Sequence, residues 1–341
     1  MHDEPGRDRP HHMRFQGPIG TANEQGVEME QGHLPVLAEE VLTLLAPASG
    51  SLQIDATLGG GGHTERILGA TNPDGRLLGL DAEGAAIARV RERLAARFGD
   101  RLVLRQANFR ELGSVAPAAG FDSVDGLLFD LGLSSFQLAD AGRGFGIRTG
   151  GPLDMRFDTS HGVPASELLA TLDARELAAL FRRYGEEPQA GRIARAIVDA
   201  RRTAPVSTAE ELAALVQRVA PGRPGHRRIH PATRVFQALR IAVNEELDAL
   251  AAGLAAAVDL LRPGGRLVVL SYHSLEDRIV KRFMETERKG CICPPAVPIC
   301  VCGRSPRLRL ITKSVTAGQA ELAVNPRARS ARLRAAERTA A

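Results

Sequence analysis

A run of four glycines and the aspartates on either side of it are the residues of this 341-residue chain whose spacing points to chemistry. Asp55 ends an apolar segment, the glycines 59–62 follow it, and His63 comes directly after them. A strand that ends in such a turn and opens into a helix presents bare backbone N–H groups to a ligand at the edge of a sheet. Glycine is needed there because a side chain would block the ligand's approach. Taken alone, the run is equally typical of a flexible loop.

Asp81 ends the next apolar segment, about 20 residues after the glycines, where nucleotide-binding sheets place an acid that accepts hydrogen bonds from ribose hydroxyls. The two features together predict an adenosine-containing ligand, either NAD or S-adenosylmethionine. The order Gly-x-Gly-x-x-Gly is absent, and a carboxylate at Asp55 repels a pyrophosphate but suits a cationic sulfonium and an ammonium group. We therefore expect S-adenosylmethionine, with its adenine beside Phe109. Phe109 is equally typical of an ordinary core residue.

Asp130 follows the apolar run 126–129, where an unpaired buried carboxylate would cost several kcal/mol, so a purely structural role explains it poorly. The carboxyl ends of parallel strands meet at one crevice, and we expect Asp130 there, beside the donor. It is our first candidate catalytic residue, in contact with whatever group accepts the methyl, and Ser134 is the second. His273 is the third, although a helix cap at Ser274 explains its segment as well.

The elements that must position these residues alternate along the chain. Apolar segments typical of buried strands lie at 51–57, 76–82, 101–108, 124–132 and 266–274. An amphipathic pattern at 85–98 separates two of them. This order predicts an α/β fold with a doubly wound, mostly parallel sheet of the Rossmann type.

More than a hundred residues separate the fourth and fifth strand segments, far more than one crossover helix needs. Helical patterns at 165–183, 190–202 and 208–220 predict an inserted all-helical domain, and the run 235–261 predicts one long helix that returns to the sheet. The predicted division is a flexible tail (1–31), the first part of the sheet domain (32–138), the helical insert (139–232), and the second part with a basic C-terminal segment (233–341).

Composition narrows the class of protein. The 44 basic and 40 acidic residues leave a formal charge of +4, which permits a polyanionic partner only where basic residues cluster. We found no stretch near the roughly 20 apolar residues that cross a bilayer, and no apolar core of a secretory signal at the start. We expect a cytoplasmic protein with no membrane partner.

Seven blocks of the sequence resemble one family. They are HLPVLAEEVLTLL, DATLGGGGHT, FDLGLSSFQL, RGFGIRTGGPLDMRFD, HPATRVFQALRIAVNEEL, PGGRLVVLSYHSLEDRIVK and NPRARSARLR. Together they resemble the RsmH (MraW) family of bacterial methyltransferases over nearly everything from 33 to 334. Two departures are Gly146 and Ile147, where the family usually carries Ser and Phe, and the N-terminal tail, which has no family counterpart.

The resemblance implies a class I methyltransferase fold and S-adenosylmethionine as donor. It also implies an acceptor, the exocyclic N4 of a cytidine (cytosine-1402) of 16S rRNA, in the decoding region of the small ribosomal subunit. The donor-binding residues that we expect are Gly60, Gly61, Gly62, His63, Asp81, Phe109, Asp130 and Gln137. A methyltransferase for DNA or another RNA amine, and a non-catalytic ribosome-assembly factor, are the alternatives.

Basic residues cluster in the insert and near the C-terminus, as a surface that neutralises phosphates requires. Runs of charged residues are usually solvated surfaces, so this pattern alone does not establish RNA binding. The candidate RNA-binding residues are His230, Arg234, Arg227, Arg228, Arg327 and Arg329.

All four cysteines of the chain lie within twelve residues, at Cys291, Cys293, Cys300 and Cys302. Four thiolates this close can enclose a tetrahedral zinc ion, although C-x-C pairs are less usual in structural sites than C-x-x-C. A reduced, ordered loop without metal is the alternative, and both stay open here. The sequence does not indicate an oligomeric state.

Overall fold

A seven-stranded sheet organises the computed structural model, which describes residues 34–221, 230–289, 291–294, 299 and 301–340. The predicted tail therefore lies outside the described residues. Five strands run parallel: β1 (Leu52–Asp55), β2 (Arg76–Asp81), β3 (Leu102–Gln106), β4 (Val124–Asp130) and β5 (Leu261–Ser271). The predicted doubly wound, mostly parallel sheet is confirmed.

Two C-terminal strands extend this sheet in the antiparallel sense and were not predicted. β7 (Arg332–Arg338) pairs with β5 on one side and with β6 (Leu308–Val315) on the other, which gives the order β3-β2-β1-β4-β5-β7-β6. Both strands interleave arginines or lysines with apolar residues, and β6 is largely solvent-accessible. Such strands lack the continuous apolar run by which the parallel strands were found.

The strand order reverses at β1, which pairs with β2 on one side and with β4 on the other. In an open parallel sheet the crevice for a ligand lies beyond the carboxyl ends of the strands at this switch point. Asp55 ends β1 and Asp130 ends β4, so the fold itself brings the carboxyl ends of both strands to the edge where the crevice lies.

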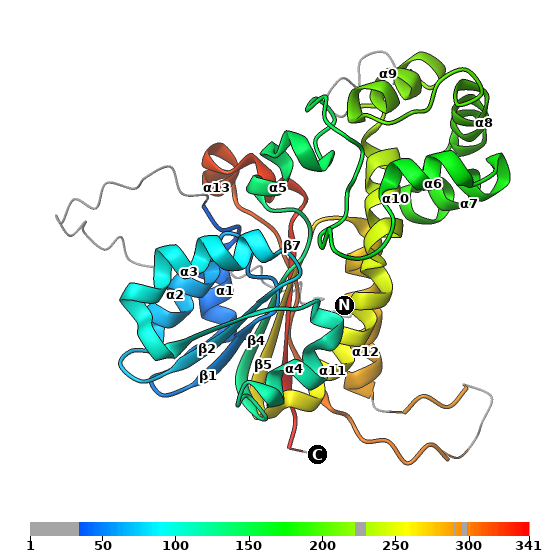
Figure 1. Ribbon diagram of the computed structural model, residues 1–341. Helices are drawn as coiled ribbons and strands as arrows, with labels where there is room; N and C mark the ends of the chain where they lie inside the picture. The colour runs from blue at the N-terminus through cyan, green and yellow to red at the C-terminus, as the bar shows by residue number, and fades with distance from the viewer. Residues whose placement is uncertain (1–33, 222–229, 290, 295–298, 300, 341) are drawn as a thin grey trace, which may run out of the picture. The chain divides into compact units, whose positions relative to one another are not determined.

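Helices cover both faces of the sheet (Figure 1). One layer consists of α1 (Ala38–Leu45), α2 (Gly62–Ala70) and α3 (Gly84–Phe98), and its apolar side chains share a buried core with the sheet. The other layer consists of α4 (Leu112–Ala118), α11 (Glu246–Leu260) and α12 (Ser274–Lys289), with a second core. Burial on both faces explains why the parallel strands are continuously apolar.

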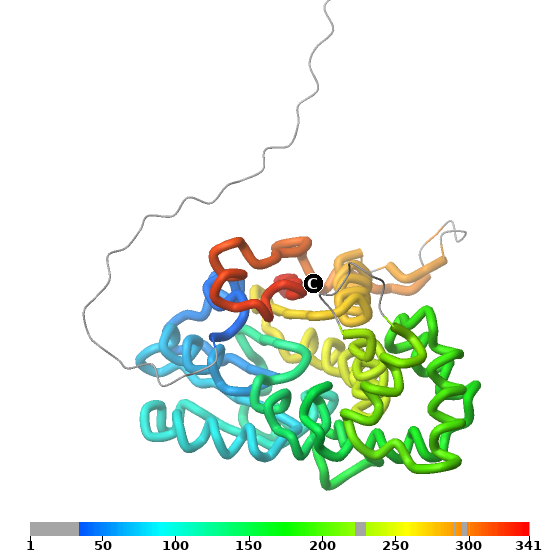
Figure 2. Tube along the Cα trace, turned by 90° about the horizontal axis from the view of Figure 1, so that it is seen from above, coloured from blue at the N-terminus to red at the C-terminus, as the bar shows by residue number. Residues whose placement is uncertain are grey.

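The described residues of the insert contain four α-helices: α6 (Ala165–Thr171), α7 (Ala174–Gly185), α8 (Ala190–Ala200) and α9 (Ala209–Val219). They surround a third core with Phe181 and Ile193 fully buried, and α10 (Thr233–Asn244) adds Val235 and Leu239 to it. Figure 2 shows these green helices gathered beside α10. The predicted run 165–183 is two helices, because the Asp173 side chain caps α7 in a capping box with Glu176.

The single long helix predicted for 235–261 is wrong. The chain breaks at Glu245, which adopts a left-handed conformation (φ 50°) between the end of α10 and the start of α11. The break is held by the ion pair between Arg240 and Glu246 and by the hydrogen bond from the Phe157 amide to Asn244. No helix in the part of the chain that the structure describes is long and apolar enough to cross a membrane.

Candidate functional site

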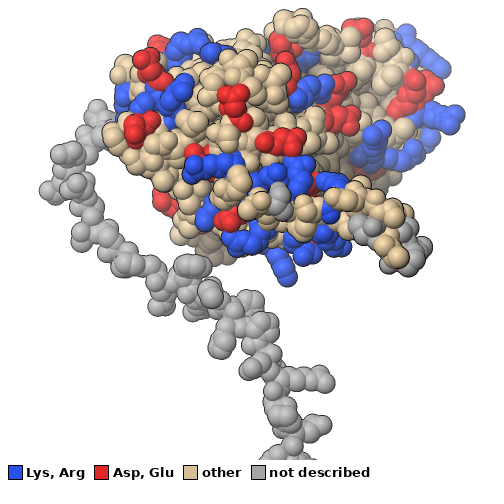
Figure 3. Space-filling view, turned by 90° about the horizontal axis from the view of Figure 1, so that it is seen from below, with Lys and Arg blue, Asp and Glu red and all other residues tan. Residues whose placement is uncertain are grey.

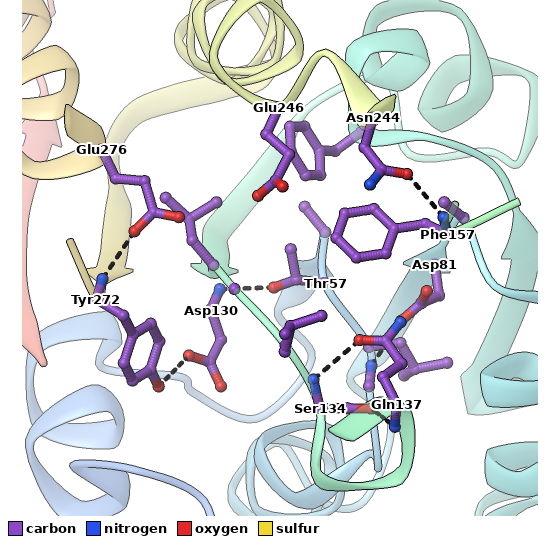
Figure 4. A pocket seen from close by; sticks show the side chains of 18 of the residues that line it. Thr57, Asp81, Asp130, Ser134, Gln137, Phe157, Asn244, Glu246, Tyr272 and Glu276 are labelled. Atoms are coloured by element: carbon purple, nitrogen blue, oxygen red, sulfur yellow. Dashed lines mark hydrogen bonds between the residues drawn. The ribbon is translucent and has the colours of Figure 1, made fainter. Parts of the chain in front are cut away.

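A cavity of about 520 Å³ opens at the switch point of the sheet (Figure 4). Its walls come from the loops after β1, β2, β3 and β4, from the break between α10 and α11, and from the residues after β5. The predicted site residues that line it are Gly60, Gly62, His63, Asp81, Phe109, Asp130, Ser134, Gln137, His273 and Arg327. The sheet edge thus brings nine of the ten predicted donor-binding and catalytic residues to one place.

Gly61 is the predicted donor residue that does not line the cavity. It precedes α2 with φ 74°, and a Cβ atom on it would lie 2.8 Å from Cγ2 of Val90 on α3. A glycine is therefore required at this position for backbone conformation and for close packing against α3. Gly60 and Gly62 do present backbone to the cavity.

Asp55 lies beneath the turn and not in the cavity, which corrects our expectation that its carboxylate faces a cationic donor. The side chain is 1% exposed. Oδ2 accepts a hydrogen bond from the Thr64 hydroxyl at 2.7 Å, and Oδ1 accepts one from the Thr57 amide at 3.2 Å. Burial raises the pKa of this carboxyl above its usual value, against these hydrogen bonds. Asp55 shapes the glycine turn from below.

Asp81 lines the cavity and is held by backbone amides. The Gly59 amide donates to Oδ2 at 2.8 Å, and the Glu83 amide donates to Oδ1 at 2.9 Å. Burial raises the pKa of Asp81 to about 6, although both amides act in the opposite direction. Each carboxylate oxygen retains a lone pair for a further donor such as a ribose hydroxyl.

Gln137 and Ser134 form the capping box of α5 (Ser135–Ala139). The Gln137 amide N–H donates to the Ser134 hydroxyl at 3.2 Å, and the Ser134 amide donates to Oε1 of Gln137 at 3.0 Å. Nε2 of Gln137 also donates to the buried carboxylate of Glu83 at 2.9 Å. Nη1 of Arg143 lies 3.4 Å from Oε1 of the same carboxylate. These contacts explain both residues structurally, and the acceptor role of Ser134 stays a prediction.

Asp130 is oriented by a residue that sequence reasoning missed, Tyr272. The Tyr272 hydroxyl donates to Oδ1 of Asp130 at 2.7 Å, and Thr57 accepts the Asp130 amide at 2.5 Å (Figure 4). Burial, and next the charge of Asp130, raise the pKa of Tyr272 well above 10, so its hydroxyl stays protonated and can only donate to this carboxylate. Nε2 of His63 lies 3.5 Å from Oδ2 and has no hydrogen-bond partner among the described residues. Oδ2 is therefore the oxygen available to a ligand.

The break between α10 and α11 supplies a second group of residues that the sequence did not reveal. Nε and Nη2 of Arg240 donate to the two carboxylate oxygens of Glu246 at 2.7 and 2.8 Å, in a bidentate pair almost shielded from solvent. In one continuous helix residues six apart do not share a face, so the pair requires the break. Both residues line the cavity.

Asn244 connects the same break to the start of the insert. Its Nδ2 donates to the backbone oxygens of Met155 and Arg240, and its Oδ1 accepts the Phe157 amide at 2.7 Å. The Phe157 ring consequently points into the cavity, where Glu246 points toward the same space (Figure 4). Phe145 stacks against Phe157 with ring centroids 5.7 Å apart.

His273 lies after β5, two residues beyond its end at Ser271, and is engaged by Glu276. Nε2 of His273 is 3.1 Å from Oε1 of Glu276, and Oε2 accepts the amides of Tyr272 and His273 at 2.8 and 3.2 Å. Although burial acts to raise the pKa of Glu276, contacts with His273 and Arg240 lower it below its usual value. These contacts cap α12 from His273, whose Nδ1 also accepts the Glu276 amide at 3.4 Å. The predicted cap at Ser274 is wrong, because the Ser274 hydroxyl donates to Glu186 at 2.7 Å.

The candidate RNA-binding residues divide into three groups. Arg327, in the short 3-10 helix Pro326–Ser330, lines the cavity and donates to the Ser135 hydroxyl, and Arg329 is exposed beside it. Arg234 donates to the Glu186 carbonyl at 3.2 Å, and Nδ1 of His230 accepts the amide of the residue two places on, so both have structural partners. Arg227 and Arg228 lie outside the described residues.

The described cysteines do not line the cavity and lie on the segment between α12 and β6. Cys291, Cys293 and Cys302 are described and lie close together. Cys300 lies outside the described residues.

This chain is similar to several known proteins. A relative from Thermomicrobium roseum, "Ribosomal RNA small subunit methyltransferase H", is 58% identical over 90% of this chain and 94% of its own length. A relative of the same name from Syntrophotalea carbinolica is 51% identical over 90% of this chain and 98% of its own. An rRNA methylase structure from Streptococcus thermophilus is similar with a TM-score of 0.40 at 10% identity, over 89% of this chain and 93% of that one. Residues 30–339 match the MraW methylase family, and the chain belongs to it.

Proposed function

We propose that this protein transfers a methyl group from S-adenosylmethionine to the exocyclic N4 of a cytidine in 16S rRNA of the small ribosomal subunit, in the cytoplasm. Membership of the MraW methylase family and the names of the relatives support a methyltransferase that acts on small-subunit rRNA. The observation that carries the proposal is one cavity in which Asp81 and Asp130 both present carboxylate oxygens.

The cavity fits the donor in size and in the chemistry of its walls. Asp81 would accept hydrogen bonds from the ribose hydroxyls, Phe109 would contact the adenine, and the backbone at Gly60 and Gly62 would lie against the rest of the molecule. When bound, the donor supplies a methyl group on a positively charged sulfur. Asp130 also lines the cavity and keeps its carboxylate for the acceptor, whereas the charge of Glu246 is neutralised by its bidentate pair with Arg240.

Asp130 would hold the acceptor amine. The lone pair of a cytosine amine is delocalised into the ring, so the amine is a poor nucleophile and must be oriented. Oδ2 of Asp130 accepts one amine hydrogen while Oδ1 stays bound to Tyr272. As the nitrogen–carbon bond forms and the sulfur–carbon bond breaks, the amine gives up this proton to Oδ2, and the sulfur leaves as a neutral thioether.

The acceptor base would enter from the side of the insert. A base inside a duplex cannot reach a cavity at the edge of a sheet, so the cytidine must leave its stack. Phe157 offers an aromatic face in the cavity, and Arg327 at its wall offers charge to a phosphate. With two Tyr and no Trp in the chain, contacts to the RNA backbone carry most of the affinity.

The test is methyl transfer from labelled donor by the full chain to three substrates: assembled small subunits, free 16S rRNA and duplex DNA. We expect label in the small-subunit rRNA and, after digestion to nucleosides, N4-methylcytidine by mass spectrometry. Label in DNA at a comparable rate would indicate a different acceptor class. Absence of label in all three, with donor bound, would indicate a non-catalytic assembly factor.

A further inference from the structure

The cysteine segment has a geometry that the methyl-transfer site does not explain. The Sγ atoms of Cys291, Cys293 and Cys302 all lie within 4.8 Å of one another. We propose that these three thiolates bind a zinc ion that fixes the segment between α12 and β6. The sequence supplies a further cysteine at position 300, and the three described thiolates carry the proposal without it.

The ends of the segment are tied together, which brings its two limbs side by side. Arg304 donates to Oε1 of Glu287 at 2.7 Å, and the Arg307 amide donates to the Glu287 carbonyl at 2.8 Å. Cys291 and Cys293 lie just after the outgoing limb leaves α12, and Cys302 lies just before the returning limb reaches Arg304. Thiolates from both limbs therefore meet at the base of the loop.

Hydrophobic burial does not hold the described residues of this loop. Ile292, Ile299 and Val301 are 53%, 76% and 81% exposed, and no helix or strand is present in the described residues between α12 and β6. Figure 1 shows this orange segment extending away from the sheet, and Figure 3 shows it projecting from the surface next to Lys and Arg side chains. A loop without a core needs a cross-link to keep three sulfurs together.

The sulfur spacing favours a single ion over the other cross-links that cysteines make. Zinc bound to thiolates at about 2.3 Å in a tetrahedron places the sulfurs roughly 3.8 Å apart, which small side-chain rotations reach from the observed arrangement. A disulfide would join two of the sulfurs at about 2.0 Å and leave the third unexplained. An iron–sulfur cluster would hold its thiolates farther apart than one ion does. Thiolate ligands and tetrahedral geometry select zinc.

The experiment is metal analysis of the full chain, purified under reducing conditions without chelator and reconstituted with zinc. We expect about one equivalent of zinc per chain. Cys291→Ser and Cys302→Ser should each retain less than about a tenth of an equivalent, whereas Ile292→Ala, a change between two ligands, should bind as the wild type does. Retention of donor binding by the serine variants would show that they are folded.

Thiol titration gives an independent readout, because every cysteine of the chain lies in this segment. We expect at least three of the four thiols to be protected with zinc bound and all four to react after a chelator is added. Wild-type protein that binds less than about a tenth of an equivalent after reconstitution, or serine variants that bind zinc fully, would overturn the proposal.

Discussion

The two halves of the cavity are built in different ways. On the donor side the partners are close in sequence: Asp55 binds Thr64, nine residues away, and Gly59 binds Asp81, 22 residues away. On the acceptor side Tyr272 binds Asp130 across 142 residues, and Asn244 binds Phe157 across 87. The donor side is a local strand–turn–helix feature, whereas the acceptor side exists only once the start of the insert, α10 and β5 are in place.

Because the two halves are built separately, we expect donor binding and methyl transfer to be lost separately. Changes on the donor side should weaken donor binding, and changes on the acceptor side should slow transfer or loosen the fold while donor binding persists.

The buried pair at the helix break should give the largest effect. Glu246→Gln leaves the Arg240 guanidinium buried without its counter-charge, and we expect a loss of about 3–5 kcal/mol in the free energy of unfolding. Urea titration measures it.

Two variants make this result specific. Glu245→Gln removes the carboxylate next in sequence, which pairs with Arg110 at the surface. It should change the free energy of unfolding by less than about 1 kcal/mol. The double variant Arg240→Met/Glu246→Leu should recover most of the stability without recovering methylation. A Glu246→Gln protein as stable as wild type would show that the break does not depend on the pair.

Asp81→Asn should weaken donor binding about tenfold or more at pH 7.5, because an amide accepts ribose hydroxyls less well than a carboxylate. In the wild type, protonation of Asp81 below its pKa of about 6 should raise the donor Kd by about tenfold per pH unit. Calorimetric titration across pH measures both, and the variant should lose the pH dependence. An identical pH profile in the variant would assign the titration to another group.

The same raised pKa acts in the opposite direction on the stability of the donor-free protein: low pH weakens donor binding but favours the folded state. Between the usual value of 3.8 and about 6 the folded chain holds a proton on Asp81 that the unfolded chain has released. The stabilisation from this group is therefore present at low pH and is lost as pH rises through 6. In Asp81→Asn this contribution should vanish from the pH dependence of unfolding.

Tyr272→Phe should lower kcat about tenfold and leave the donor Kd unchanged, because the ring remains while Asp130 loses the donor on Oδ1. Tyr184→Phe is the matched control, since Tyr184 is the other tyrosine of the chain and lies in the insert. A kcat equal to that of wild type would mean that Asp130 is oriented without Tyr272.

Gly61→Ala should give the smallest effect, a loss of about 1 kcal/mol in the free energy of unfolding, because of its positive φ and the close Val90 contact. Gly69→Ala in the same helix meets nothing within 4 Å and should stabilise by about 0.5 kcal/mol. Thermal unfolding compares them. A Gly61→Ala protein at least as stable as wild type would show that the turn is not strained.

The features predicted correctly from the sequence are those with a local signal. Apolar runs gave the parallel strands, and the residues that end them, Asp81 and Asp130, lie in the cavity as expected. Two predictions failed for physical reasons. Asp55 also ends a strand, but its carboxylate turns into the protein to bind Thr64, and strand position alone does not decide side-chain direction.

The continuous helix over 235–261 failed because helical periodicity does not detect a break held by tertiary contacts. The apolar pattern continues through Glu245, and the pair between Arg240 and Glu246 forms only after the break. Tyr272 and Phe157 were missed for the same reason: their partners are distant in sequence, and no local motif marks them.

The most direct test of separate halves that meet at Asp130 uses Asp130→Asn, which keeps the shape of the side chain. The measurement pairs the donor Kd with the single-turnover rate of methyl transfer to small subunits. We predict a Kd within about threefold of wild type and a rate lower by about a thousandfold, since the amide cannot take the amine proton. A rate close to that of wild type, or loss of donor binding in parallel with the rate, would contradict the account.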